Sequence, residues 1–445
     1  MITMNGKYTT AKVMIDDVEE SCIAQITKFI NNPAFTAPVA IMPDCHAGKS
    51  SVVGFTMPLT DKVIPNTIGV DIGCGMLASK IYGASQDIYN NLELIDLMIR
   101  KTIPFGQMIH KKPISNFERE FPFAVAQANV NCFVKKLFGN NAIKNVPVYN
   151  MEWFETKCKQ IDINVRYACD SIGTLGGGNH FIEIGVDLNN DMWITIHSGS
   201  RNFGLKIANY WTEVAQNVDT TALDLEMKKE IDKIKANAIT TELRQRINQD
   251  IKLARLKIYG RADKISDELS YLTEENAMGY LFDMIFAQLY AVWNRKQMQR
   301  LIFNKALLSP FTAVETIESI HNYIDFNDMV IRKGAISAHV GETMIIPFNM
   351  RDGILICKGK GNKEWNESAP HGAGRVLARG AAKRALSLET FKEQMKGIYS
   401  TSVVAGTLDE APNAYKPASV IEAAIEPTAE VVNRIKPIMN LKSLT

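Results

Sequence analysis

The chain has 445 residues, of which 46% are hydrophobic and 22% are charged, as in ordinary globular proteins with a substantial core. Its 50 Lys and Arg residues nearly balance its 48 Asp and Glu residues, and this argues against a globally basic nucleic-acid binder. The sequence shows no long apolar run, no secretory pattern and no CxxC spacing among its seven cysteines, so we expect a cytoplasmic protein without membrane spans or disulfides.

After an expected helix over residues 17–29, two apolar segments each run into a polar loop. The first leads from Val39 into Pro43-Asp44-Cys45-His46, and the second contains Gly69-Val70-Asp71-Ile72-Gly73-Cys74-Gly75. Sites are commonly built in loops at strand ends, and three glycines would let the backbone curl until Asp71 and Cys74 reach one point. A tight turn with a core cysteine is the alternative for the second loop.

The centre of the chain predicts a β-hairpin. Two β-like runs, within residues 173–186 and 192–201, flank the turn-rich stretch Asp187-Leu188-Asn189-Asn190-Asp191. If the hairpin closes symmetrically about residues 188 and 189, His180 and His197 lie opposite each other. Their Cβ atoms would then be about 4.5–5.5 Å apart, close enough to share a metal site.

Helical periodicity dominates residues 204–308, with expected helices over residues 205–218, 223–258 and 277–307. Further on we expect a strand over residues 354–357 and a helix over residues 419–434. We see no internal repeat and no low-complexity linker. The sequence therefore favours one domain over residues 1–445, with a helical insertion at about residues 204–308.

Near the C-terminus, the loop Ser368-Ala369-Pro370-His371-Gly372-Ala373-Gly374-Arg375 places a histidine directly before a helix-favouring run over residues 376–386. Glycines at the start of a helix leave backbone N–H groups free to face an anion. A neutral imidazole can also attack phosphorus and carry it as a phosphoramidate. An ordinary histidine in a surface loop is the alternative.

Asp71, Cys74, His180, His197 and His321 offer a carboxylate, a thiolate and three imidazoles, which suit a transition metal such as Mn, Zn, Co or Fe. They exceed what one tetrahedral site needs. Two ions about 3.5–4 Å apart would use all five and would suit phosphoryl chemistry. Spacing alone does not show which of these distant residues meet.

Eight collinear motifs point further: PDCHAGKS, GVDIGCGM, GTLGGGNHFIE, HSGSR, HNYI, RKGA, SAPHGAGR and DEAPNAYK. In this order they closely resemble the RtcB family of RNA-splicing and RNA-repair ligases, from about residue 38 to the C-terminus. The family joins an RNA 3′-phosphate or 2′,3′-cyclic phosphate to a 5′-hydroxyl, using GTP and Mn²⁺. The resemblance implies an RNA ligase for RNA repair or tRNA splicing, with an α+β fold of antiparallel sheets flanked by helices.

The resemblance also implies roles for individual residues. His371 would become guanylylated and Asp44 would orient it. Two Mn²⁺ ions would be held by Asp71, Cys74, His180, His197 and His321, with Cys74 bridging them. The guanosine nucleotide would be lined by Asn179, His180, Phe181, Ile182, Glu183, His321, Asn322, Pro347, Phe348, Asn349, Met350, His371, Gly372, Ala373, Gly374 and Lys442. Glu183 has the chemistry to accept from N1 and N2 of guanine. The implied partners are RNA with those ends and GTP, and a separate activating protein is a further candidate.

The chain departs from the family pattern at the nucleobase pocket. Pro347-Phe348-Asn349-Met350 and Ile354 stand where many members have Pro-Gly-Ser-Met and a serine that touches the base. Lys442-Ser443-Leu444-Thr445 replaces the usual terminal Lys-Gly. These changes bear on guanine selectivity more than on the reaction and indicate a divergent paralogue. Two alternatives are a metal-dependent RNA cyclic phosphodiesterase that does not ligate and a silent RNA-binding relative.

Overall fold

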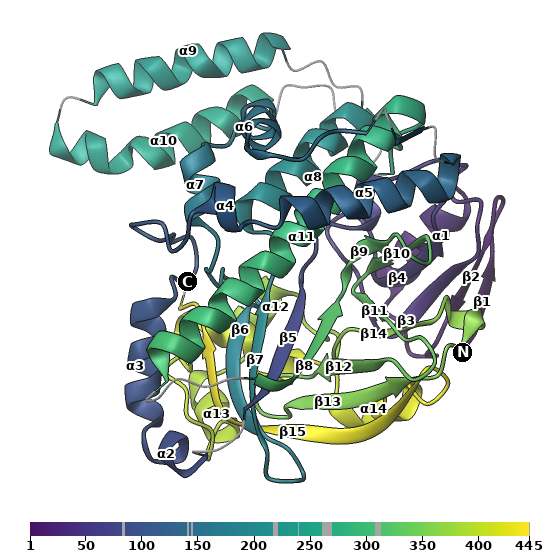
Figure 1. Cartoon of the computed structure of the whole chain (residues 1–445), viewed down its shortest axis with the longest axis vertical. Coiled ribbons are helices and arrows are strands. Elements are labelled where there is room, and N and C mark those ends of the chain that lie inside the picture. The colour runs from purple at the N-terminus through teal and green to yellow at the C-terminus, as the bar shows by residue number, and fades with distance from the viewer. Residues whose placement is uncertain are drawn as a thin grey trace.

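The computed structural model describes residues 1–81, 85–139, 142–143, 146–216, 221–238, 240–259, 269–307 and 313–444. Most helices gather on one side of the molecule and the sheets on the other, and the 28-residue helix α11 (Glu274–Leu301) runs diagonally between them (Figure 1). The predicted α+β fold with antiparallel sheets is confirmed. Among the described helices, none has the length and apolar character needed to span a membrane.

A seven-stranded sheet carries much of the site. Its order is β12-β13-β15-β6-β7-β5-β8, and every neighbouring pair is antiparallel. The sheet curls until its two edge strands meet, since Ile345 N of β12 donates to Ser319 Oγ of β8 at 3.0 Å. The strands are β5 (Gly75–Ile81), β6 (Phe181–Val186), β7 (Met192–Ser198), β8 (Ala313–Ile320), β12 (Thr343–Pro347), β13 (Ile354–Gly359) and β15 (Ala429–Lys442).

One face of this sheet packs against helices, and the other face opens toward the site. Side chains alternate between the faces along a strand, so Ile182 and Ile184 of β6 join a core formed with α3 and the end of α11. Phe181 belongs to a second apolar cluster on the opposite, concave face. Glu183 shares that concave face with Phe181, and this is the face that opens toward the site.

A six-stranded sheet has the order β1-β2-β3-β4-β10-β9 and contains one parallel pair, β2 with β3. Its strands are β1 (Ile2–Asn5), β2 (Thr10–Val13), β3 (Val39–His46), β4 (Val53–Pro58), β9 (Asn322–Asp325) and β10 (Val330–Lys333). Strands β11 (Ala335–Ser337) and β14 (Ser368–Pro370) form a short antiparallel ladder directly before His371.

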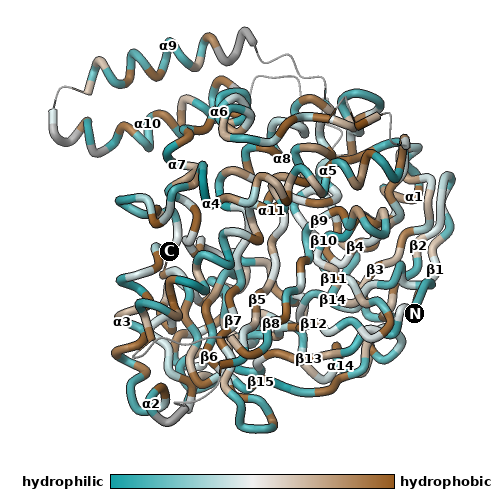
Figure 2. Tube along the Cα trace, in the orientation of Figure 1, coloured by the Kyte–Doolittle hydropathy of each residue, from teal (hydrophilic) through white to brown (hydrophobic). Residues whose placement is uncertain are grey.

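The largest core lies where α11 and its neighbouring helices pack against the six-stranded sheet. In Figure 2, α9 and α10 alternate between polar and apolar residues as they project away from the body. The α-helices other than α11 are α1 (Glu20–Ile30), α2 (Ser85–Asn90), α3 (Leu92–Thr102), α4 (Phe117–Glu120), α5 (Phe123–Phe138), α6 (Met151–Gln160), α7 (Val165–Asp170), α8 (Arg201–Gln216), α9 (Thr221–Asn237), α10 (Thr241–Tyr259), α12 (Arg379–Ala385), α13 (Leu388–Gln394) and α14 (Ala418–Ala424).

Three helix predictions need correction. The expected helix over residues 419–434 ends at Ala424 as α14, because Pro427 cannot continue a helix, and the chain then enters strand β15. The stretch over residues 223–258 forms two helices, α9 and α10, that pack against each other. The helix expected directly after the His371 loop starts only at Arg379, so the helix N-terminus does not lie beside the histidine.

Candidate active site

A cavity of about 610 Å³ lies where the two large sheets and helix α8 meet. Three of the predicted site residues do not line it. Asp44 and His180 are buried against the lining residues His371 and Cys74, and the Ile182 side chain points into the core on the other face of its sheet. All the others do: Asp71, Cys74, Asn179, Phe181, Glu183, His197, His321, Asn322, Pro347, Phe348, Asn349, Met350, His371, Gly372, Ala373, Gly374 and Lys442.

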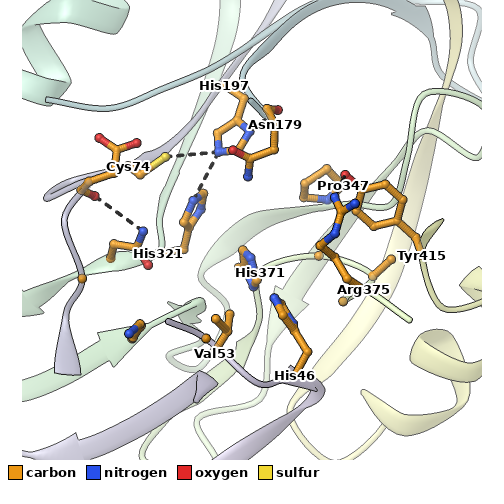
Figure 3. A pocket seen from close by; sticks show the side chains of 18 of the residues that line it. His46, Val53, Cys74, Asn179, His197, His321, Pro347, His371, Arg375 and Tyr415 are labelled. Atoms are coloured by element: carbon orange, nitrogen blue, oxygen red, sulfur yellow. Dashed lines mark hydrogen bonds between the residues drawn. The ribbon is translucent and has the colours of Figure 1, made fainter. Parts of the chain in front are cut away.

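The five predicted metal ligands form one chain of contacts, and within it Cys74, His180 and His197 have ligand atoms within 4.8 Å of one another. Its Sγ lies 3.4 Å from His180 Nε2 and 3.3 Å from His197 Nε2. His197 Nε2 also lies 3.3 Å from His321 Nε2, and His180 Nε2 lies 2.9 Å from Asp71 Oδ2. Figure 3 shows the resulting chain of contacts from Cys74 through His197 to His321.

Strand pairing explains why these residues converge. The start of β5 pairs on one side with the end of β7 (Gly75 with Ser198) and on the other with the end of β8 (Gly75 with Ile320). Cys74, which precedes β5, therefore lies beside His197 of β7 and His321 after β8. His180 arrives from the loop before β6, where Gly176 has φ +95° and any side chain would collide with Arg201.

The predicted register of the β6–β7 hairpin is wrong by one residue. His197 pairs with Phe181 rather than with His180, because the turn holds five residues and closes about residue 189. Asp187 stabilises this turn by accepting from the N–H groups of Asn189 and Asp191. The two histidines still meet, with ring centroids 5.1 Å apart, because His180 lies before the strand and is free of its alternation.

Hydrogen bonds at Nδ1 orient the rings of His180 and His197 so that each Nε2 faces Cys74. His180 Nδ1 lies 2.9 Å from Leu175 O, and His197 Nδ1 lies 3.2 Å from Asn179 O. A carbonyl oxygen only accepts, so Nδ1 carries a proton in both rings. The neutral His197 ring therefore offers its Nε2 lone pair toward Cys74, whereas His180 Nε2 donates to Asp71 Oδ2 at 2.9 Å. Burial lowers the pKa of His197 and of His321 well below the usual range, which keeps both rings neutral.

This donor set fits a divalent transition metal. Two imidazoles, a carboxylate and a thiol converge, and His321 Nδ1 is buried without a hydrogen-bond partner. Burial alone would raise the pKa of Asp71, but His180, together with Cys74 and Arg201, holds it at about 2. Burial, with the nearby Asp71 carboxylate, raises the pKa of the Cys74 thiol, so ionising that thiol requires a cation beside it.

Two residues of α11 hold the ligand loops, and the sequence analysis missed both. Arg295 is wholly buried and donates to Gly73 O at 2.8 Å and to Ser198 O at 2.9 Å, while pairing with Glu318 at 2.8 Å. Its neighbour Asn294 accepts from Gly173 N and donates to Gly199 O. In the sequence, Asn294 and Arg295 are two polar residues within a long helical pattern, which reveals neither their burial nor the loops that they hold.

His371 lies on the other side of His321, with ring centroids 4.9 Å apart. Its Nδ1 lies 2.6 Å from Asp44 Oδ2, a charge contact without hydrogen-bond geometry. The same Oδ2 accepts from the backbone N–H groups of His371 and Gly372 at 3.2 Å. The carboxylate thus fixes both the loop and the ring, and Nε2 is left for chemistry.

His46 is a second histidine near His371, and its role was not predicted (Figure 3). Its Nδ1 lies 3.1 Å from Asp44 O. Burial lowers the pKa of His46 to about 4, so this ring is neutral near pH 7. It therefore adds no positive charge to the pocket beside His371.

Three cationic side chains surround the buried carboxylate of Glu410, which lines the cavity together with Lys442 near the C-terminus of the chain. Glu410 Oε2 lies 2.9 Å from Lys442 Nζ, and Glu410 Oε1 lies 2.9 Å from Arg379 and 3.3 Å from Arg375. Burial opposes ionisation, but Lys442, Arg379 and Arg375 hold the pKa of Glu410 at about 2. Glu410, Arg375 and Arg379 had no predicted role, although two of them lie within recognised motifs.

A further cation, Lys333, lines the cavity and donates to Asn66 O at 3.0 Å. Burial lowers the pKa of Lys333 to about 8. Among the residues that the structure describes, no carboxylate forms an ion pair with this half-buried ammonium, so an anionic ligand would supply the missing countercharge. The cavity therefore combines a candidate metal cluster, a candidate nucleophilic histidine and several cations suited to phosphates.

Comparison with known proteins gives a consistent result. A family profile described as "tRNA-splicing ligase RtcB" matches residues 25–443. The chain is 30% identical to "RNA-splicing ligase RtcB" of Escherichia coli (strain K12), over 96% of this chain and 95% of that protein. It is 26% identical to "tRNA-splicing ligase RtcB" of Pyrobaculum aerophilum, over 86% and 83% of the two chains. It is 23% identical to the protein of that name from Nanoarchaeum equitans, over 98% and 94%.

Proposed function

Because the chain belongs to the RtcB family of RNA-splicing ligases, we propose that it is a GTP- and Mn²⁺-dependent RNA ligase. It would join RNA 3′-phosphate or 2′,3′-cyclic phosphate ends to 5′-hydroxyl ends through a covalent His371–GMP intermediate. The observation that carries this proposal is the 2.6 Å approach of His371 Nδ1 to the buried Asp44 carboxylate, beside the five-residue cluster. RNA ligation itself agrees with the names of the similar proteins.

In the first step, His371 Nε2 attacks the α-phosphorus of GTP. A P–N bond forms, and the P–O bond to pyrophosphate breaks. Asp44 keeps the Nδ1 proton in place, so the lone pair stays on Nε2, and it stabilises the positive charge that develops on the ring. Lys442, Arg375 and Arg379 share the single carboxylate of Glu410, and their excess positive charge would neutralise nucleotide phosphates.

In the second step, an oxygen of the RNA 3′-phosphate attacks the same phosphorus, and the P–N bond breaks to release His371. An end that begins as a 2′,3′-cyclic phosphate is first opened by water. The 5′-hydroxyl of the other RNA then attacks the activated 3′-phosphorus, and GMP leaves. Lys333 is a candidate contact for the RNA phosphate, since it lines the same cavity and its charge is half-buried.

Asp71, Cys74, His180, His197 and His321 are the residues that would hold Mn²⁺. When bound, the metal would neutralise charge on the reacting phosphates and polarise their oxygens. The loops on which these ligands stand are fixed by Arg295 and Asn294. The ligands are thus preorganised, and little rearrangement would accompany metal binding.

An end-joining assay tests this function. One RNA carries a labelled 3′-phosphate or 2′,3′-cyclic phosphate and the other a 5′-hydroxyl, and they are incubated with GTP and Mn²⁺. We expect a joined product that requires both additions, and none from a control pair with 3′-hydroxyl and 5′-phosphate ends. Opening of the cyclic phosphate without joining and without GTP would contradict ligation and would favour the phosphodiesterase alternative.

A further inference from the structure

Asn440 of β15 lies directly beside Glu183 of the adjacent strand β6, and both residues line the same cavity. The two residues are register partners in the β15–β6 pair, so their side chains stand next to each other on the concave face. Asn440 Nδ2 donates to Glu183 Oε2 at 2.7 Å. Only 1% of Asn440 and 2% of Glu183 is exposed, yet both line the cavity.

The pair leaves two acceptor oxygens without partners. Glu183 Oε1 and Asn440 Oδ1 are both buried and have no hydrogen-bond partner. Buried polar atoms in proteins are nearly always paired, and an exception at a cavity calls for an explanation. Two neighbouring acceptors on a cavity wall match a ligand that offers two neighbouring donors.

Guanine has such an edge, because its N1–H and its 2-amino group are adjacent donors, whereas adenine offers one donor beside an acceptor nitrogen. Two other residues that line the cavity, Asn349 and Ile354, do not offer a free acceptor to this edge of guanine. The Asn349 amide is engaged within its own turn by Asp352 and by the N–H groups of Arg351 and Asp352, and Ile354 is apolar. Lys442, one step along the same face of β15, holds its ammonium 5.1 Å from the centroid of the Phe181 ring.

We propose that Asn440 is a specificity-determining residue that accepts a hydrogen from the 2-amino group of guanine, while Glu183 accepts from N1–H. The more acidic N1–H donor pairs with the carboxylate, and the neutral amide oxygen takes the 2-amino hydrogen. This assignment rests on the proposed function, since it concerns the nucleotide that labels His371. It makes Asn440 a substitute for polar contacts that Asn349 and Ile354 do not supply.

The experiment compares GTP with inosine triphosphate, which lacks the 2-amino group, as donors for covalent labelling of the Mn²⁺-loaded protein. We expect the wild-type protein to label more efficiently with GTP at subsaturating concentration. In Asn440→Leu, which has similar volume, the GTP preference should fall about tenfold because one hydrogen bond is lost, with little change for inosine triphosphate. Asn440→Ala should lower the GTP preference by the same factor. Because this substitution only removes atoms, it serves as the second variant if Asn440→Leu does not fold.

Asn433→Leu is the matched control, because Asn433 lies on the same strand and donates to an acidic residue, Asp187, outside the cavity. This variant should keep the wild-type preference. An unchanged GTP preference in both Asn440 variants would overturn the role of Asn440 while leaving the ligase proposal intact. Absence of labelling by either nucleotide in the wild-type protein would instead overturn the proposed function, and this inference with it.

Discussion

Asp44 and His371 are 327 residues apart in the chain, yet the Asp44 carboxylate accepts from the backbone of the His371 loop and lies 2.6 Å from the imidazole. The short β11–β14 ladder delivers His371 to the end of β3, where Asp44 stands. The histidine is therefore held by a buried carboxylate rather than by the helix that follows it.

The first prediction concerns Asp44→Asn, which keeps the shape of the side chain and removes its charge. Covalent labelling by GTP should slow about a hundredfold or more, because the charge that stabilises the imidazolium is lost. The rate is measured in a single turnover with Mn²⁺-loaded protein. Thermal unfolding of the variant serves as the control for folding. A labelling rate within about threefold of the wild-type rate would contradict the positioning role of Asp44.

A second prediction follows from the raised pKa of the Cys74 thiol. Because the thiol is protonated in the metal-free protein and a metal-bound cysteine is a thiolate, adding Mn²⁺ should release a proton. Binding should also strengthen as the pH rises, since fewer protons then compete. Proton release is measured with a pH indicator in weak buffer.

The matched variant for this measurement is Cys74→Ala, which should bind Mn²⁺ less tightly and release less acid. Cys45, which is buried and is not among the candidate metal ligands, provides a control as Cys45→Ala. Equal proton release by the wild type and by Cys74→Ala would show that the thiol is not a ligand.

A third prediction concerns the pH dependence of GTP binding. Burial raises the pKa of Glu183 to about 8, against the opposing effects of Asn440 and Lys442, so near pH 7 the carboxyl must release a proton before Oε1 can accept from guanine. Guanine binds best to the carboxylate. The KM for GTP should therefore fall as the pH rises from about 6.5 to about 8.5, whereas Glu183→Gln should lose most of this dependence. The same slope in both proteins would exclude Glu183 as its source.

The raised pKa of Glu183 also affects the free energy of unfolding, which should decrease as the pH rises while GTP binding improves. The folded protein binds the Glu183 proton more tightly than the unfolded chain does. This contribution to the free energy of unfolding is therefore full below the ordinary carboxyl pKa and is lost as the pH rises through about 8. Denaturant unfolding of the wild type and Glu183→Gln should show a smaller decline with pH in the variant.

The fourth prediction tests the clamp on α11. Arg295→Met should destabilise the protein by about 3 kcal/mol, because it leaves Gly73 O and Ser198 O without a donor and Glu318 without a partner. It should also weaken Mn²⁺ binding. Arg300→Met on the same helix removes an exposed pair with Glu120 and should change stability by less than about 1 kcal/mol. Similar effects of the two substitutions would contradict the clamp.

The sequence predicted well those features that depend on local pattern. The β6–β7 hairpin follows from its turn residues. The expected strand before Asp71 and Cys74 was wrong, because these residues follow the 3-10 helix Pro65–Thr67 and precede strand β5. The register of the hairpin was wrong because the Asp187 carboxylate closes a five-residue turn, a side-chain effect that the strand pattern does not reveal. The meeting of the metal ligands came from the family resemblance, since no spacing rule links Cys74 to His321.

Features that depend on distant pairing were missed. Residues 429–442 form a strand because β13 and β6 lie on either side to pair with them, and neither neighbour is close in sequence. Asn440 was overlooked for the same reason, as its partnership with Glu183 exists only in that register. Arg295 is one of several cations on α11, and only packing shows that it is buried.

The central claim is that His371 carries the guanylyl group, and the direct measurement is covalent labelling by GTP that bears a label on its α-phosphate. Wild-type protein and His371→Ala are loaded with Mn²⁺, incubated, denatured and digested. We expect acid-labile, alkali-stable label on the peptide containing His371 and none on the variant. The account would be contradicted by metal-loaded wild-type protein that takes up no label, or by His371→Ala that is labelled as strongly as the wild type.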